Sequence, residues 1–454
     1  MNPRRPNVFP RQEDGRPVLF GSSGIRGVVG KEITPELAMA VGAAVGSRYD
    51  DLVIGRDPRV SGPMLAAAFA AGAMSVGTDV CDAGMVSTPT LARGAKGYDA
   101  GVVITASHNP AEYNGMKLWN PDGLAFTEEQ QEEVEAAMKR GATRADWRFS
   151  GQLKQRTDLA EHHLESILSS VGAADLTVAV DCGCGATSHL TPVLLRRMGC
   201  RVIALNAHPD GHFPGRDPEP LEENLTLLTQ TVKATGADLG VAHDGDGDRM
   251  VAVDDRGRYV GGDRLLPLFA KVHARKAIVV PVDASMVLDD LLPGVAVHRT
   301  RVGDVFVGQE LKRLGADFGG EPSGTWIFPR ETLCPDGPLA AAILVGLVQS
   351  RGRPLSEMLD NLPEYPILRE AHRFVADQRL AVKEALDRAF AGLDAEVTRV
   401  DGWRAAFPDG WFVVRLSGTE PKVRITAEAR ERVRAEELLE KGRALVHAAV
   451  STAK

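Results

Sequence analysis

Three aspartates alternate with glycines in the segment Asp244-Gly-Asp-Gly-Asp-Arg249, which follows the apolar stretch 237–242. Three carboxylates packed together repel one another unless a cation lies between them. The glycines let the backbone curl so that all three side chains point inward. Hard oxygen ligands of this kind suit Mg²⁺. The pattern therefore predicts that Asp244, Asp246 and Asp248 bind one Mg²⁺ ion per chain.

Two other interpretations of this acidic loop have to be weighed. A calcium-binding EF-hand loop also opens D-x-D-x-D, but it needs glycine at its sixth position and glutamate at its twelfth. This chain has Arg249 and Asp255 at those positions. A solvated acidic turn without any metal is the other alternative. Charge repulsion disfavours it, so the metal site is the preferred hypothesis. His243, directly before the loop, is a candidate to hold the metal ligands in place.

A serine follows a second apolar run, because Ala100–Ile104 leads into Thr105-Ala-Ser-His-Asn-Pro110. A serine just past the end of a buried strand, with a proline that stops further pairing, is expected to be exposed and held in place. A plain polar turn is an alternative, and so is a Ser–His–Asp hydrolase. The nucleophile-elbow pattern GxSxG is not present around Ser107. Taken alone, this loop leaves the function open.

Two further loops carry groups suited to a phosphorylated sugar. In the loop 319–324, Glu321 and Ser323 offer acceptors and a donor at a spacing that fits two neighbouring hydroxyls. In the loop 415–424, hydroxyls and backbone N–H groups can bind an anion, and two arginines add a charged fork. The residues of this candidate phosphate clamp are Arg415, Ser417, Gly418, Thr419 and Arg424. A structural turn is the alternative for the first loop, and a solvated charged turn for the second.

The elements that must position these loops repeat one local pattern. An apolar strand at 51–54 runs into a polar turn and a helical stretch at 62–77, and the same order returns from 176 and from 277. Strand, turn, helix and strand in that order predict α/β units. We therefore expect three related α/β domains with mixed, largely parallel sheets, at residues 1–150, 151–255 and 256–365.

The last part of the chain has a different pattern. Strands are predicted at 371–375, 397–400 and 411–415, and amphipathic helices at 378–390 and 435–449. This order indicates a smaller α+β domain with an antiparallel sheet at residues 366–454.

The composition excludes several classes of protein. A chain of 454 residues is too long for one core, and its net charge of −8 argues against a nucleic-acid surface. Five cysteines without a CxxC pair indicate reduced thiols. The polar N-terminus does not resemble a secretory signal, and no apolar stretch reaches the roughly 18 residues of a membrane span. We expect a cytoplasmic protein with neither nucleic-acid nor membrane partners.

Taken together and in chain order, the four loops resemble those of the α-D-phosphohexomutase superfamily. The similarity begins at Phe20-Gly-Ser-Ser-Gly-Ile-Arg-Gly27 and extends to the last loop, so it covers nearly the whole chain. One such motif could arise by chance, whereas four in the family order, one in each expected domain, are specific. The resemblance implies four domains around a central cleft, with the fourth closing over the substrate phosphate.

The resemblance also implies a role for each candidate residue. Ser107 is similar to the family's phosphoserine, which would give a further oxygen ligand to the Mg²⁺ ion. The residues similar to those around the reacting phosphate are Arg26, His108, Lys117 and Arg249. Those similar to the sugar contacts are Glu321 and Ser323, and those similar to the phosphate clamp are Arg415, Ser417, Gly418 and Thr419.

The activity implied is an exchange of hexose 6-phosphate and hexose 1-phosphate. Phospho-Ser107 would donate to the free hydroxyl, and the other phosphate of the resulting hexose 1,6-bisphosphate would return to the serine. This bisphosphate would be the intermediate and the activator, and sugar phosphates the only expected partners, with the chain acting as a monomer or homodimer. A phosphatase and a non-catalytic sugar-phosphate sensor are more distant alternatives.

Two departures separate the chain from the better-known phosphomannomutase/phosphoglucomutase pattern. That branch commonly has histidine after GExSG, where this chain has Thr325, and VGH where it has Val302-Gly303-Asp304. The VGD variant is more similar to phosphoglucosamine mutases and archaeal-type relatives. The carboxylate of Asp304 would attract an ammonium group on C2 of the sugar, or it could equally be structural. Glucosamine phosphate therefore ranks first as substrate, and mannose or glucose phosphate second.

Overall fold

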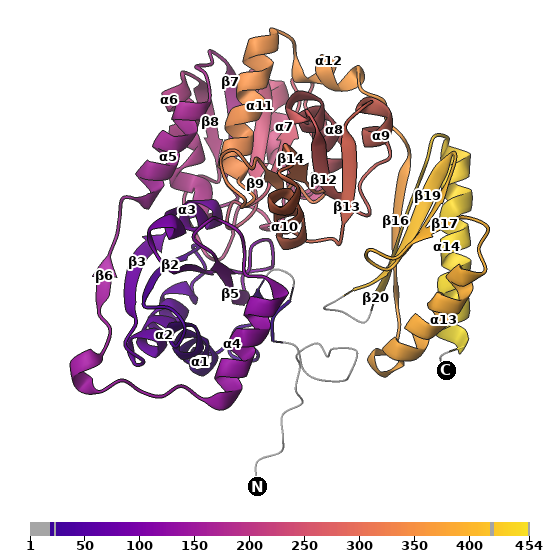
Figure 1. Ribbon diagram of the computed structural model, residues 1–454. Coiled ribbons are helices and arrows are strands. Elements are labelled where there is room, and N and C mark those ends of the chain that lie inside the picture. Colours follow the sequence, from indigo (N-terminus) through magenta and orange to yellow (C-terminus); the bar gives the residue numbers. More distant parts are fainter. Residues whose placement is uncertain (1–18, 22–23, 418–421, 453–454) are drawn as a thin grey trace.

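The computed structural model describes residues 19–21, 24–417 and 422–452, which form four β-sheets flanked by helices (Figure 1). In chain order the sheets have six, five, four and five strands. The first three mix parallel and antiparallel pairs, and the fourth is entirely antiparallel. The predicted fold class is confirmed, while the predicted limits of each domain stay predictions.

The first sheet has the strand order β1-β5-β4-β2-β3-β6. Its elements are β1 (Ile25–Val28), α1 (Pro35–Gly46), β2 (Asp51–Arg56), α2 (Gly62–Met74), β3 (Asp79–Met85), α3 (Thr88–Gly94), β4 (Ala100–Ile104), β5 (Tyr113–Trp119), α4 (Glu128–Arg140) and β6 (Leu153–Gln155).

The second sheet has the order β11-β10-β9-β7-β8. Its part of the chain contains α5 (Leu159–Ser170), β7 (Thr177–Asp181), α6 (Thr191–Met198), β8 (Arg201–Leu205), α7 (Thr226–Thr235), β9 (Leu239–His243), β10 (Met250–Val253) and β11 (Tyr259–Val260).

The third sheet has the order β13-β12-β14-β15. Its part of the chain contains α8 (Gly262–His273), β12 (Ala277–Pro281), α9 (Val287–Leu291), β13 (Ala296–Thr300), α10 (Asp304–Leu314), β14 (Phe318–Gly320), β15 (Trp326–Ile327), α11 (Gly337–Arg351) and α12 (Leu355–Asp360).

One arrangement of four strands occurs in each of the first three sheets. The orders β5-β4-β2-β3, β10-β9-β7-β8 and β15-β14-β12-β13 each contain one antiparallel junction followed by two parallel junctions. The serine, aspartate and glutamate loops follow β4, β9 and β14, which are equivalent strands. Loops at the carboxyl ends of parallel strands are the usual place for a site in such sheets. The repeat thus places all three candidate loops at equivalent positions.

The second and third sheets are joined by a continuous hydrophobic core. Its buried apolar side chains run from Leu164 in α5 to Leu362 just after α12. Helix α11 belongs to the third part of the chain, yet it contacts α6 and β10 of the second. The parts of the chain that carry the four sheets are called the first to fourth units. The second and third units are therefore packed as one body.

The fourth sheet, in the order β16-β20-β19-β18-β17, has a core of its own and meets the third unit through mainly polar contacts. Arg369 forms two 2.8 Å hydrogen bonds with Asp263, and Glu428 accepts from the hydroxyl of Ser285 at 2.5 Å. A small apolar cluster that includes Val282 and Trp411 completes the contact. The elements are β16 (Ile367–Arg373), α13 (Arg379–Ala391), β17 (Glu396–Thr398), β18 (Trp403–Phe407), β19 (Gly410–Leu416), β20 (Lys422–Ala429) and α14 (Arg432–Thr452).

Several elements differ from their predicted bounds. The strand predicted at 371–375 is β16, which begins four residues earlier. Strands β18 and β20 were not predicted. Each lies between two other strands and pairs with both. Along β20 polar and apolar residues alternate strictly, so the sequence does carry a strand signal there. Among the described residues, no helix combines the length and apolar character needed to cross a bilayer.

Helices α1 and α2 approach closely because each has a glycine at the contact. A Cβ atom on Gly42 would lie 2.1 Å from the carbonyl oxygen of Phe69, and one on Gly72 would lie 2.1 Å from that of Met39. Neither carbonyl can move without shifting its helix. These two glycines therefore set the distance between the helices that cover the first sheet.

We expect Gly42→Ala to lower the free energy of unfolding of the first domain by about 1–3 kcal/mol, because the added methyl group forces the helices apart. The matched control is Gly346→Ala in α11, whose Cβ would meet no atom within 4 Å. That change should be neutral or stabilise the protein by about 0.5–1 kcal/mol. Thermal denaturation followed by circular dichroism measures both, and equal melting temperatures for the two variants would contradict the role of Gly42.

Candidate active site

The serine and aspartate loops meet at a hydrogen bond between the first and second units. The hydroxyl of Ser107 donates to a carboxylate oxygen of Asp244 at 2.6 Å. These residues are 137 positions apart in the chain. The predicted meeting of a serine hydroxyl and the aspartate cluster therefore occurs in the structure. The expectation that Ser107 is exposed was wrong, because the aspartate loop packs against it and leaves it buried.

The backbone of Ser107 is held in an unusual conformation. Its φ is +50°, in the left-handed region, where a residue with a side chain costs roughly 1–2 kcal/mol. Its N–H donates to the hydroxyl oxygen of Thr105 at 2.8 Å. A Cβ on Gly245 would lie 2.6 Å from the Ser107 carbonyl oxygen, so glycine is required there for the two loops to touch.

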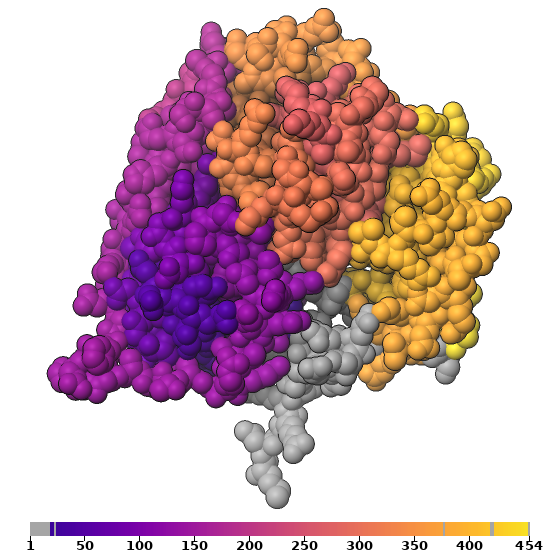
Figure 2. Space-filling view, in the orientation of Figure 1, coloured from indigo at the N-terminus to yellow at the C-terminus, as the bar shows by residue number. Residues whose placement is uncertain are grey.

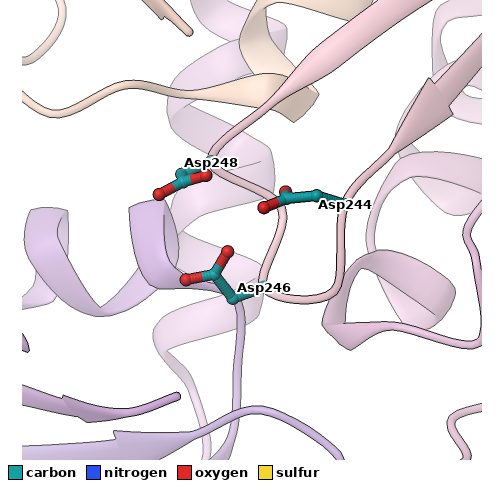
Figure 3. Close-up of side chains that lie close together, drawn as sticks. All are labelled: Asp244, Asp246 and Asp248. Carbon is teal, nitrogen blue, oxygen red and sulfur yellow. The ribbon is translucent and has the colours of Figure 1, made fainter. Parts of the chain in front are cut away.

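The three aspartates of the loop between β9 and β10 point toward one another (Figure 3). Their carboxylate oxygens lie within 4.8 Å of one another, and among the described residues this is the one cluster of three or more potential metal ligands. One buried oxygen each of Asp246 and Asp248 has no hydrogen-bond partner. Unpaired buried carboxylate oxygens need a cation, so the residues present fit a hard divalent ion such as Mg²⁺.

Charge repulsion within this cluster is visible in the pKa values. Burial, followed by the charges of Asp248 and Asp246, raises the pKa of Asp244 well above its usual range. Lys117 lies 2.5 Å from Asp248 and 3.5 Å from Asp246. Burial would lower the pKa of Lys117, but these carboxylates outweigh it and raise it. The lysine therefore stays charged and offsets part of the negative charge.

Two neighbouring residues hold the aspartate loop in shape. The hydroxyl of Thr88, at the start of α3, donates to Asp246 at 2.6 Å and so joins the first unit to the loop. His243 is fully buried, and its ring nitrogens lie 3.0 Å from the carbonyl oxygen of Arg249 and 3.0 Å from the hydroxyl of Thr191. Burial lowers the pKa of His243 to about 4, so the ring is neutral and bridges the two ends of the loop.

Three basic groups face the serine. Arg26 donates to the side chain of Asn109 at 3.3 Å, and Arg249 donates to Glu219 at 3.3 Å. The imidazole of His108 lies 3.4 Å from the hydroxyl of Ser107. Burial and the nearby guanidinium and ammonium groups lower the pKa of His108 well below its usual value, so this ring is neutral at pH 7. The pocket thus combines fixed cations with one neutral proton acceptor.

The glutamate loop lies beside the aspartate loop. Met250 donates its N–H to the carbonyl oxygen of Gly324 at 2.9 Å, which joins the strand after the aspartates to the sugar-binding candidates. Glu321 accepts from the N–H of Gly303 at 2.7 Å and from the hydroxyl of Ser323 at 3.1 Å. Burial and the charge of Asp304, at the start of α10, raise the pKa of Glu321 to about 7.

The fourth unit contributes the candidate clamp. Arg415 on β19 is paired with Arg424 on β20, and Arg415 donates to a carboxylate oxygen of Asp401 at 2.8 Å. The same oxygen accepts from the N–H of Val302 at 2.9 Å, so the clamp arginine is tied to the loop that carries Asp304. Gly418 and Thr419 of the predicted clamp lie outside the described residues, while Ser417 lies inside them.

All four units border one cleft of about 1280 Å³. Figure 2 shows the fourth unit, in yellow, packed against the third, in orange. The predicted residues that line the cleft are Arg26, Ser107, His108, Lys117, Asp248, Arg249, Asp304, Glu321, Ser323, Arg415, Ser417 and Arg424. Asp244 and Asp246 are fully buried beneath it. Residues as far apart in the chain as Arg26 and Arg424 therefore share one opening.

Sequence reasoning missed several residues that shape this cleft. Glu219 and Asp401 bind the predicted arginines, and Thr88 binds a predicted aspartate. None of the three lies in a motif. Glu219 contacts Arg249 within the second unit, Asp401 joins Arg415 to the N–H of Val302 in the third unit, and Thr88 reaches the aspartate loop from the first unit. A signal existed for Thr88 alone, since Ser87-Thr-Pro-Thr90 has the form of a helix start.

We expect Mg²⁺ to raise the melting temperature of metal-free protein, with a stabilisation of about 2.7 kcal/mol when the ion is at 100 times its Kd. Asp244→Asn should abolish this response, since it removes one charged ligand. The same change relieves repulsion, so the metal-free variant should melt no lower than metal-free wild type. Scanning calorimetry after chelation measures both effects, and Asp175→Asn, at an exposed ion pair, is the control. A full Mg²⁺ response in Asp244→Asn would rule out this ligand.

Comparison with known proteins gives the family. Four consecutive parts of the chain match family models described as phosphoglucomutase/phosphomannomutase, with α/β/α domain I at residues 17–145, domain II at 158–257 and domain III at 261–365, and the C-terminal domain at 375–444. In solved structures, a phosphoglucomutase/phosphomannomutase family protein of Burkholderia thailandensis has a TM-score of 0.84 and 31% identity, over 95% of this chain and 97% of that one.

Curated relatives agree with these matches. A probable phosphoglucosamine mutase of Methanocella arvoryzae is 50% identical over 428 residues, which cover 94% of this chain and 98% of the relative. One of Methanosarcina acetivorans is 51% identical over 419 residues, covering 91% and 96%. The chain therefore belongs to the phosphoglucomutase/phosphomannomutase family of phosphohexomutases.

Proposed function

We propose that this phosphohexomutase acts on glucosamine phosphate and that Ser107 carries the transferred phosphate. The observation that carries the proposal is the position of the Ser107 hydroxyl, 2.6 Å from Asp244 and next to a cleft bordered by cations. A serine hydroxyl alone is a weak nucleophile. Phosphoryl transfer depends mainly on alignment and on neutralisation of charge, and this site supplies both.

The proposed reaction has two transfers. In the first, the bond between phosphorus and the serine oxygen of phospho-Ser107 breaks, and a new bond forms to the free hydroxyl oxygen of the hexose monophosphate. The hydroxyl proton leaves the sugar, and the serine oxygen regains a proton. The hexose 1,6-bisphosphate then turns over in the cleft. In the second transfer the bond between the other phosphorus and its sugar oxygen breaks, and a bond forms from that phosphorus to the oxygen of Ser107. The serine hydroxyl loses its proton and the sugar oxygen gains one, which leaves the isomeric monophosphate.

The residues around the serine have complementary parts in this proposal. Lys117 stays protonated, so it neutralises charge and does not act as a base. Arg26 and Arg249 add two more positive charges beside the transferred group. His108 is neutral and close to the serine oxygen, so it is suited to exchange a proton there. We propose Asp244, Asp246 and Asp248 as the ligands of one Mg²⁺ ion, which when bound neutralises charge on the phosphoryl group.

The far end of the cleft is suited to the phosphate that does not react. Arg415 and Arg424 lie on adjacent strands and border the cleft together with Ser417. Two guanidinium groups and a hydroxyl make a favourable phosphate site. Between this clamp and Ser107, Glu321 and Ser323 are placed to bind the sugar hydroxyls. We therefore propose that the substrate spans the cleft from the clamp to the serine.

The choice of glucosamine rests on two neighbouring carboxylates. Burial raises the pKa values of Asp304 and Glu321, and the charge of Asp304 raises that of Glu321 further. A protonated amine beside them would relieve this repulsion, whereas a neutral hydroxyl would not. The named relatives at about half identity are probable phosphoglucosamine mutases, which supports the same choice.

We expect Ser107→Ala to lower kcat by roughly 10³-fold or more, as when a covalent nucleophile is removed. Intact-mass spectrometry should detect phosphate on wild-type protein incubated with hexose 1,6-bisphosphate and none at this position in the variant. Ser169→Ala, on the exposed surface of α5, is the control and should match wild type. Full activity of Ser107→Ala would refute the phosphoserine, and steady release of inorganic phosphate by wild type would favour a phosphatase.

We expect Asp304→Asn to lower kcat/KM for glucosamine 6-phosphate about 10- to 100-fold more than for glucose 6-phosphate, because a charge-assisted contact to the amine is lost. Parallel assays on glucosamine, glucose and mannose phosphates measure this difference. For wild type, glucosamine phosphate should give the highest kcat/KM of the three. If it gives the lowest, or if the Asp304 variant loses equally on all three sugars, the assignment of the substrate is wrong.

A further inference from the structure

Arg59 is a buried arginine that the proposed chemistry does not use. Its side chain is fully buried, and its guanidinium donates to four backbone carbonyl oxygens, three in the serine loop and one at the start of β5. These are the carbonyl oxygens of Ser107 at 2.9 Å, Asn109 at 2.6 Å, Pro110 at 2.5 Å and Tyr113 at 2.9 Å. One rigid guanidinium group thus holds the whole turn that carries Ser107.

Asp57 anchors this guanidinium and extends the network to the other side of the serine. Its carboxylate accepts from Arg59 Nε at 3.0 Å and from the hydroxyl of Thr105 at 2.7 Å. The same Thr105 oxygen accepts the N–H of Ser107 at 2.8 Å. We call Asp57, Arg59 and Thr105 the serine clasp. Through it, the N–H and the carbonyl group of Ser107 are both tied to one buried ion pair.

The conformation of Ser107 explains why such a clasp is needed. A non-glycine residue at φ +50° tends to relax to a more favourable backbone conformation unless its surroundings hold it. Relaxation would swing the hydroxyl away from Asp244 and from the cations of the cleft. Because small misplacements of a reacting group cost large factors in rate, the clasp acts directly on alignment.

The second unit closes the clasp from outside. The ring of Phe213 lies 5.0 Å from the guanidinium carbon of Arg59. A Cβ on Gly211 would lie 2.4 Å from the carbonyl oxygen of Pro58, so this loop presses directly on the turn that carries Arg59. The guanidinium therefore has no access to water, and its hydrogen bonds to the serine loop have no competitor.

We infer that Arg59 is a positioning residue for the transferred phosphoryl group, acting through the serine loop. The inference rests on the proposed role of Ser107 and deepens it. Arg59 touches neither the cleft nor the substrate. Its guanidinium group fixes the orientation of the Ser107 hydroxyl, and its ion pair with Asp57 maintains that orientation during both transfers.

A second buried arginine serves as a matched control. Arg216 pairs with Asp181 at 3.1 Å and donates to the carbonyl oxygen of His243 at 2.6 Å, immediately before the aspartate loop. It therefore holds the metal loop as Arg59 holds the serine loop. Replacing the guanidinium group of Arg216 should raise the Mg²⁺ concentration needed for half-maximal activity, whereas replacing that of Arg59 should not.

The test is Arg59→Lys, which keeps the charge opposite Asp57 but cannot make the four carbonyl contacts. We expect kcat to fall about 10- to 100-fold with KM within about threefold of wild type. The rate at which hexose 1,6-bisphosphate phosphorylates Ser107, followed by intact-mass spectrometry, should fall by the same factor. The Mg²⁺ dependence should stay as in wild type, and it should shift in Arg216→Lys.

Two substitutions of Thr105 test the hydrogen bond to the N–H of Ser107, in case Arg59→Lys does not fold. Thr105→Val removes the oxygen that accepts the Ser107 N–H and should lower kcat without raising KM, while Thr105→Ser should restore the wild-type rate. Wild-type kcat and phosphorylation rate in a folded Arg59→Lys, or equal rates in the two Thr105 variants, overturn the inference. If wild type itself takes up no phosphate on Ser107, the proposed function fails instead.

Discussion

Repulsion among three buried carboxylates is the constraint on which the rest of the site depends. Asp244, Asp246 and Asp248 cannot share one loop between β9 and β10 unless positive charge surrounds them. Lys117 from the first unit supplies part of it and thereby draws β5 against the second unit. Thr88 and the Ser107 hydroxyl satisfy further oxygens from the same side. The electrostatics of one loop thus fix how two domains meet.

The chemistry of the site could be predicted from the sequence because it is concentrated in short loops. The acidic loop and the serine loop each follow an apolar strand, and the repeat of strand, turn and helix placed them at comparable points of comparable domains. What the sequence could not provide is the contact between them, since nothing in either loop encodes a partner 137 residues away. Glu219, Asp401 and Arg59 escaped notice for the same reason, since each acts on a residue far from it in the chain: Arg249, Val302 and Ser107 respectively.

The fold shows the same division between local and long-range information. Strands such as β4, β7 and β12 were predicted close to their observed positions. Both faces of these strands are buried, which requires a continuous run of apolar residues that is easily recognised in the sequence. Strand β20 alternates polar and apolar residues over its whole length, so it could have been predicted, whereas β18 is short and its pair Ala405-Ala406 interrupts the alternation. Local pattern is therefore a good guide to the interior of the α/β units. In the antiparallel sheet the local pattern indicates β20, while β18 depends more on pairing with the strands on its two sides.

The two kinds of contact around the third unit have different mechanical consequences. Separating it from the second unit would expose a continuous apolar core, whereas separating it from the fourth mainly exchanges ion pairs such as Arg369–Asp263 for bonds to water. Bending therefore costs least at the connection 361–366 between α12 and β16. The fourth sheet is therefore the part of the molecule whose tilt would open the cleft while exposing the least apolar surface.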